Sequence, residues 1–146
     1  MYIKIDIEPV ACPRPKVTRY ATYYPKRYTQ FREKMSSLLE PIPMIRASHI
    51  EMDLKFIMKR PKSNYRKKDI DERYPHVKKP DIDNLIKSVL DSLQKSSIIS
   101  DDSIVWRVSA EKHVAAKNEN PAIIIHIKKE GNQIPPLKST KTNTQT

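Results

Sequence analysis

Aspartates gather in two short segments of this chain, and their spacing suits metal chemistry. The segment KPDIDNLIKSVLDSLQ, residues 79–94, carries Asp81, Asp83 and Lys87, and the next acidic pair ends with Asp102. Carboxylate oxygens bind hard divalent cations such as Mg²⁺ and Mn²⁺. These ions activate water and stabilise the charge that develops when a phosphodiester is hydrolysed. The acidic residues therefore indicate a metal site able to hydrolyse a phosphodiester.

The segment 79–94 is predicted to form the helix that positions these groups. Its apolar side chains follow the spacing of one helical face, namely Ile82, Leu85, Ile86, Val89, Leu90 and Leu93. Asp81 and Asp83 would point about 200° apart if both were helical, so they converge only if Asp81 lies at or before the N-cap. Asp102 precedes the next strand, from which we expect its carboxylate to reach the start of the helix. Lys87, one turn beyond Asp83, would neutralise charge in the transition state or orient the nucleophile.

A structural interpretation of the same residues stays open. An aspartate before a helix is often only an N-cap, and Asp83 with Lys87 is an ordinary i, i+4 pair, a kind that stabilises a helix by about 0.2–0.5 kcal/mol. Asp91 and Asp101 are better explained as structural residues. From the residues alone, a metal site and a set of caps and pairs are equally supported.

The charge balance predicts an acidic partner. The chain has 28 Lys and Arg against 17 Asp and Glu, a net charge of +11. Nucleic acid is favoured because neutralised phosphates release counterions, and no basic amphipathic helix of a membrane binder is present. No apolar run long enough for a membrane span and no secretory leader is found, so we expect a cytoplasmic protein. The single glycine argues against glycine-rich phosphate loops and thus against ATPases and NAD enzymes.

A basic stretch near the N-terminus is the best candidate for contacting DNA. Its cationic side chains interleave with Tyr20, Tyr23 and Tyr24, a composition suited to gripping phosphates and stacking on unpaired bases. The cations are Arg14, Lys16, Arg19, Lys26 and Arg27. A second charged run is explained equally well as a DNA contact and as a solvated loop. It includes Arg60, Lys62, Arg66, Lys67 and Lys68.

The pattern of apolar residues predicts one α+β domain over residues 1–130. We expect strands within 1–10, 48–60, 103–116 and 121–130, and helices over 25–40 and 79–94. The β-α-β-α-β-β order predicts a mixed sheet with two helices, and the last two strands, separated by KNEN, are predicted to form a hairpin. Residues 60–79 are expected to form a mobile loop, and residues 131–146 a disordered tail.

The two acidic segments also resemble a known family. KPDIDNLIKSVLDSL followed by ISDDSIV is similar to the signature of RusA-type Holliday junction resolvases, which prophages commonly carry. The segment PRPKVTRYATYYP resembles the Arg-Pro-Arg/Lys-x-Thr-Arg stretch of the same family, so the likeness spans roughly residues 13–105. Many relatives have a glycine between the helix and the acidic pair, whereas QKSSIIS has none.

The resemblance implies an activity and roles for particular residues. Asp81, Asp83 and Asp102 would be the catalytic, metal-binding carboxylates and Lys87 the catalytic lysine. The protein would be a Mg²⁺-dependent homodimer, with Mn²⁺ as a possible substitute, that cuts four-way DNA junctions during recombination and repair. Two alternatives stay open: a nuclease of other branched or single-stranded DNA, and a non-catalytic, structure-selective DNA-binding protein.

Overall fold

The computed structural model describes residues 1–129, and the expected tail of residues 131–146 lies outside them. The main strands are β1 (Tyr2–Ile5), β4 (Ile50–Met58), β6 (Val105–Val114) and β7 (Ala122–Lys129). The helices are α1 (Lys26–Leu39) and α2 (Ile82–Lys95). Short strands β2 (Lys16–Val17), β3 (Thr22–Tyr23) and β5 (Tyr74–Pro75), and the 3-10 turns η1 (Lys62–Asn64) and η2 (Asp102–Ile104), complete the fold. The predicted α+β class with two helices and a mixed sheet is confirmed.

The main sheet has the strand order β1-β7-β4-β6-β5. β4 pairs in parallel with β6 and antiparallel with β7, so Leu54 lies between Ala110 and Ile125. The predicted hairpin of the last two strands is therefore wrong, because β4 separates them. Along β4 and β7 most side chains are buried, whereas half of those on β6 are exposed and only one is buried. Strands that are apolar on both faces gain most from a central position, which explains why β4 enters between the two.

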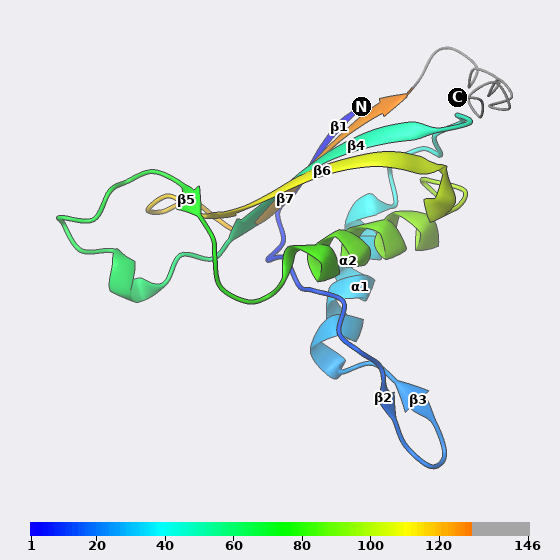
Figure 1. Ribbon diagram of the computed structural model, residues 1–146, viewed down its shortest axis with the longest axis horizontal. Helices are drawn as coiled ribbons and strands as arrows, with labels where there is room; N and C mark the ends of the chain where they lie inside the picture. The colour runs from blue at the N-terminus through cyan, green and yellow to red at the C-terminus, as the bar shows by residue number, and fades with distance from the viewer. Residues whose placement is uncertain (130–146) are drawn as a thin grey trace, which may run out of the picture.

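Both helices cover one face of this sheet (Figure 1). Pro25 holds the N-cap of α1, and Tyr28, Phe31, Met35 and Leu39 are its buried side chains. The buried side chains of α2 are Leu85, Ser88, Val89, Ser92 and Leu93. Ile86 and Leu90 only pack at the edge of the core. The apolar face of α2 is thus wider than the part that its own chain buries.

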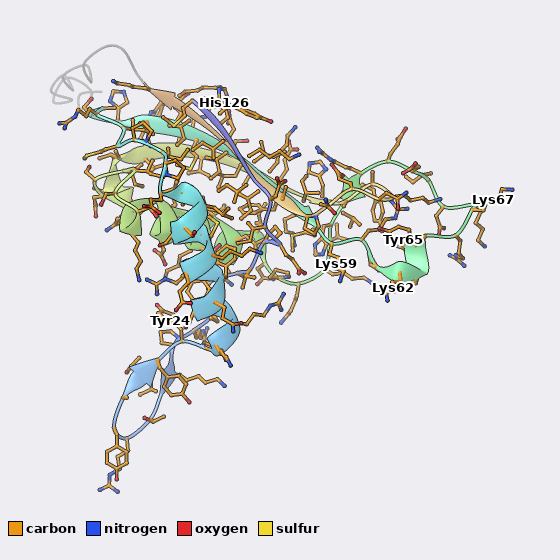
Figure 2. All side chains as sticks on the ribbon, turned by 180° about the vertical axis from the view of Figure 1, so that it is seen from behind. Tyr24, Lys59, Lys62, Tyr65, Lys67 and His126 are labelled. Carbon is orange, nitrogen blue, oxygen red and sulfur yellow. The ribbon has the colours of Figure 1, made fainter. Side chains whose placement is uncertain are left out.

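Two segments extend away from the sheet and helices. The β2–β3 hairpin projects beyond α1, and residues 61–73 form a second projection between β4 and β5 (Figure 1). Figure 2 shows Lys62, Tyr65 and Lys67 on this second projection. The fold therefore carries two basic extensions on separate elements.

The second projection has a defined anchor in Arg60. This side chain is 3% exposed, and its guanidinium donates to the carbonyl oxygens of Asn64, Ile70, Glu72 and Ala115. The rings of Tyr65 and Tyr74 lie 5.7 and 5.5 Å from its Cζ atom. Arg60 thus stabilises the loop and has no surface to offer DNA.

Candidate active site and DNA interface

Asp81 and Asp83 lie together at the start of α2. Asp81 occupies the N-cap position with φ −70° and ψ 145°, as the sequence predicts, but its carboxylate makes no capping hydrogen bond. Both residues border an open depression of about 600 Å³, along with Lys112 and residues 76–79. The simple capping role for Asp81 is therefore not realised, and its carboxylate is available for a ligand.

Asp102 lies at the opposite end of the same helix. Its backbone N–H donates to Oε1 of Gln94, at a distance of 3.1 Å, in the last turn of α2. A helix of 14 residues is about 21 Å long, so Asp102 is remote from Asp81 and Asp83. The prediction that the three carboxylates meet within one chain is wrong.

The turn after α2 explains this separation. α2 ends at Lys95, and Ser97 takes a left-handed conformation with φ 59°, which reverses the chain without the glycine seen in many relatives. The short segment that follows cannot return along the helix before β6 begins. Within residues 1–129, no three His, Cys, Asp or Glu side chains gather closely enough to hold a metal ion. The catalytic roles of the aspartates stay predictions.

The two acidic residues expected to be structural have structural contacts. Asp101 accepts a hydrogen bond from the Ser103 N–H at 3.1 Å, and hydrogen bonding to Ser103 lowers the pKa of Asp101. Asp91 is half-buried and accepts a weak hydrogen bond from Sγ of Cys12 at 3.9 Å. Burial raises the pKa of the adjacent Tyr28, and Cys12 and Asp91 raise it further. Asp91 thus faces the N-terminal segment.

Lys87 is exposed one turn after Asp83, but the described residues include no ion pair between the two. The ordinary i, i+4 pair is therefore absent from this part of the chain, and the ammonium group is open to an anion.

Sequence reasoning missed Lys112 and His76 beside the acidic pair. Nζ of Lys112 donates to the carbonyl oxygens of Lys78 and Pro80, at 2.7 Å each, and so holds the segment that leads into Asp81. Burial and the charge of Lys112 lower the pKa of His76. The signal in the sequence was the two-residue alternation of β6, which puts Lys112 on the same face of the strand as Val108 and Ala110.

The candidate DNA-binding cations are all exposed but fall on different elements. Arg14 precedes the β2–β3 hairpin, Lys16 and Arg19 belong to it, and Lys26 and Arg27 begin α1. Arg27 forms a loose ion pair with Glu8 at 3.8 Å.

The tyrosines of this stretch separate into two groups. Tyr20 at the hairpin tip is 89% exposed, and the Arg19 guanidinium lies 5.9 Å from its ring. Tyr23 is also exposed, whereas the ring of Tyr24 packs 5.2 Å from that of Tyr28. Among these three tyrosines, Tyr20 and Tyr23 are thus the ones whose rings are exposed and accessible to DNA.

Comparison with known families decides the class of the protein. The family model described as endodeoxyribonuclease RusA matches residues 6–128. The chain belongs to the RusA endodeoxyribonuclease family. The match includes both acidic segments and the β2–β3 hairpin, so the resemblance seen in the sequence is confirmed. No curated protein matches the sequence significantly.

RusA membership supports a DNA endonuclease and Holliday junction resolution, and it makes a purely non-catalytic role the weaker alternative. Among the helices of residues 1–129, none has the length and apolar content needed to cross a membrane.

Proposed function

We propose that this RusA-family chain is a divalent-metal-dependent endonuclease that resolves four-way DNA junctions during recombination and repair. The observation that carries the proposal is the pair of carboxylates of Asp81 and Asp83 at the start of α2. Both border one depression that is also lined by lysines, and the Asp81 side chain does not cap the helix. Within residues 1–129 neither carboxylate forms a capping hydrogen bond or an ion pair, and such negative groups in a chain of net charge +11 suit a cation that bridges protein and phosphate. Action in the cytoplasm of a bacterium, on chromosomal or phage DNA, belongs to the same proposal.

The proposed active site is shared between two copies of the chain. α2 and β6 run in opposite directions, since Lys112 near the end of β6 contacts the segment before α2 and Gln94 near the end of α2 contacts Asp102. A two-fold axis beside the middle of α2 would therefore bring Asp81 and Asp83 of one copy toward Asp102 of the partner subunit. Two such sites would form, one for each of two opposed strands.

The open edge of β6 supports this dimer. β5 pairs only with Val114 and His113, so the rest of that edge has no strand beside it among the described residues. Trp106 and Val108 are 59% and 36% exposed on this strand. Unpaired strand edges readily add a second strand, and exposed apolar side chains favour burial.

The charges of β6 are self-complementary about Ser109. If two β6 strands pair antiparallel with Ser109 on the axis, Arg107 lies opposite Glu111 of the partner subunit, and the reverse pair forms on the other side. Opposite charges in directly facing positions stabilise such a pair. The same arrangement sets the two α2 helices side by side on one face of a continuous sheet.

In this dimer each residue has a defined task. Asp81 and Asp83 with Asp102 of the partner subunit would hold Mg²⁺ or Mn²⁺, which supplies an activated water and offsets charge on the phosphate. Lys112 would keep the segment before α2 in place through its two carbonyl contacts. Lys87, exposed one turn along, would contact the phosphate that is cut.

The basic extensions would hold the arms of the junction. Arg14, Lys16 and Arg19 lie on or before the β2–β3 hairpin, and Lys26 and Arg27 lie at the start of α1. Each phosphate contact should add about 0.9 to the log–log salt slope of binding. Arg19→Ala should therefore lower the slope by about one, and an unchanged slope would remove Arg19 from the interface.

The decisive experiment compares labelled four-way junction, linear duplex and single-stranded DNA as substrates. We expect cutting of the junction with Mg²⁺ or Mn²⁺, binding with little cutting in Ca²⁺, and no cutting in excess EDTA. Equal cutting of single strands or other branched DNA would favour the broader nuclease, and junction binding without cutting in any metal would favour the non-catalytic alternative.

A further inference from the structure

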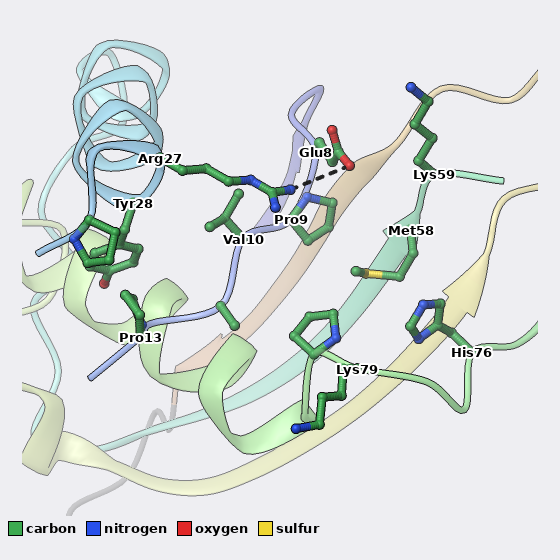
Figure 3. A pocket seen from close by; sticks show the side chains of 13 residues that line it. Glu8, Pro9, Val10, Pro13, Arg27, Tyr28, Met58, Lys59, His76 and Lys79 are labelled. Atoms are coloured by element: carbon green, nitrogen blue, oxygen red, sulfur yellow. Dashed lines mark ion pairs between the residues drawn. The ribbon is translucent and has the colours of Figure 1, made fainter. Parts of the chain in front are cut away.

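A second cavity adjoins the candidate active site. It has a volume of about 450 Å³ and lies between residues 8–13, the start of α1, the end of β4 and the segment before α2 (Figure 3). His76 and Lys79 line both this cavity and the depression that holds Asp81 and Asp83. A ligand in the cavity would therefore be continuous with one at the acidic pair.

The walls of the cavity combine an apolar surface with a cationic rim. Pro9, Val10, Pro13, Tyr28, Met58 and Pro80 form the apolar part. Arg27, Lys59 and Lys79 are exposed cations on its border, and Glu8, paired loosely with Arg27, is its one acid. Figure 3 shows Met58 between Lys59 and Lys79. This composition fits a flat, mainly apolar group that carries a negative charge.

His76 adds a polar group without a partner. Its Nδ1 atom is buried and makes no hydrogen bond among the described residues. Burial and the nearby lysines lower the pKa of His76, so the ring is neutral near pH 7 and offers one donor and one acceptor. A buried ring nitrogen usually has a partner, and a ligand with ring heteroatoms would provide one.

We propose that this cavity receives one unpaired nucleotide of the DNA substrate. The base would lie against the prolines and Met58, within reach of His76, and its phosphates would contact Lys59 and Lys79. A volume of about 450 Å³ is within the usual range for small-ligand sites, and the cavity adjoins the depression of Asp81 and Asp83, where the proposed function places the DNA backbone. The inference rests on the proposed function, since the base pairs at a branch point lose part of their stacking and are opened at lower cost than pairs within a duplex.

The test is an abasic scan of the junction, read as binding in Ca²⁺. Each nucleotide near the branch point is replaced in turn by an abasic residue, and the Kd is measured for the wild type and for Val10→Phe, which fills the cavity. For the wild type, an abasic residue at one particular position should raise the Kd about 5- to 150-fold, the range expected when the contacts of one base are lost. In Val10→Phe the same abasic position should change the Kd less than twofold.

Two matched lysine substitutions provide a second measurement, which does not depend on whether the Val10→Phe variant folds. Lys59→Gln removes a cation from the rim, and Lys55→Gln removes one from the outer face of β4. The log–log salt slope for junction binding should fall by about one for Lys59→Gln and stay unchanged for Lys55→Gln.

The outcomes distinguish a failure of the cavity proposal from a failure of the proposed function. If the wild type prefers the junction over duplex but no abasic position matters more than twofold, or Lys59→Gln and Lys55→Gln behave alike, the cavity does not hold a nucleotide and the proposed function stands. If the wild type shows no preference for the junction, the proposed function fails and this inference fails with it.

Discussion

The proposed sharing of the active site between two subunits predicts that two inactive variants restore each other's activity. Asp83→Asn removes a carboxylate at the start of α2, and Asp102→Asn removes one at its other end. Because a charged metal ligand is lost, each variant alone should cut junctions several orders of magnitude more slowly than the wild type. In a mixed dimer, one site combines both substitutions, whereas the other combines the intact Asp83 with the intact Asp102 of the partner subunit.

The size of the rescue follows from counting sites. If equal amounts of the two variants exchange subunits at random, about half of the dimers are mixed, and each has one intact site of two. The mixture should therefore contain about a quarter of the wild-type number of working sites. Mixed dimers should nick one strand and fail to make paired cuts.

The assay is single-turnover nicking of a labelled junction after the variants are mixed, partly unfolded in urea and refolded together. The matched control mixes Asp83→Asn with Asp81→Asn, which lie at the same end of α2 and leave no intact site in any dimer. If the Asp83→Asn and Asp102→Asn mixture stays as inactive as its components, or if the control mixture is rescued equally, the shared site is refuted.

Other consequences can be measured separately. Ser109→Cys should crosslink the dimer on oxidation, because facing residues of antiparallel strands have Cα atoms about 4.5–5.5 Å apart, and a monomer on a non-reducing gel would contradict the proposed axis. Arg60→Met leaves carbonyl oxygens without donors and should lower the free energy of unfolding in urea by about 2–4 kcal/mol, and a change below about 0.5 kcal/mol would contradict the anchoring role. Ser97→Gly should raise it by about 1 kcal/mol, because glycine adopts positive φ without strain, and a loss of stability would disprove this. The Arg73 guanidinium, 2.6 Å from Glu119, lowers the pKa of that carboxyl. The wild type should therefore be more stable than Glu119→Gln at a pH above the ordinary carboxyl pKa. This difference in the free energy of unfolding should disappear as the pH falls through the lowered pKa.

Local patterns in the sequence were sufficient to find most of the elements. The helix predicted over residues 79–94 is α2 at Ile82–Lys95, and the helix predicted over residues 25–40 is α1 at Lys26–Leu39. Both results follow from short-range rules, namely apolar spacing and the residues that start helices. The neighbours of each strand were not predictable in this way, since alternation shows that β6 is a strand but not that β4 lies between it and β7.

The misplaced carboxylate has a different origin, because the sequence contained the information needed. A helix that runs from Asp81 to Lys95 must separate its two ends by about 20 Å, and the acidic pair follows the second end after the short segment 96–100. Only the expectation that catalytic groups meet within one chain led to a different placement. The same rise per residue that excludes a single-chain site also makes a two-fold dimer the simplest assembly, because an antiparallel pair of α2 helices brings each start to the other's end. Exposed Trp106 and Val108 beside that helix give such a pair a surface to bury.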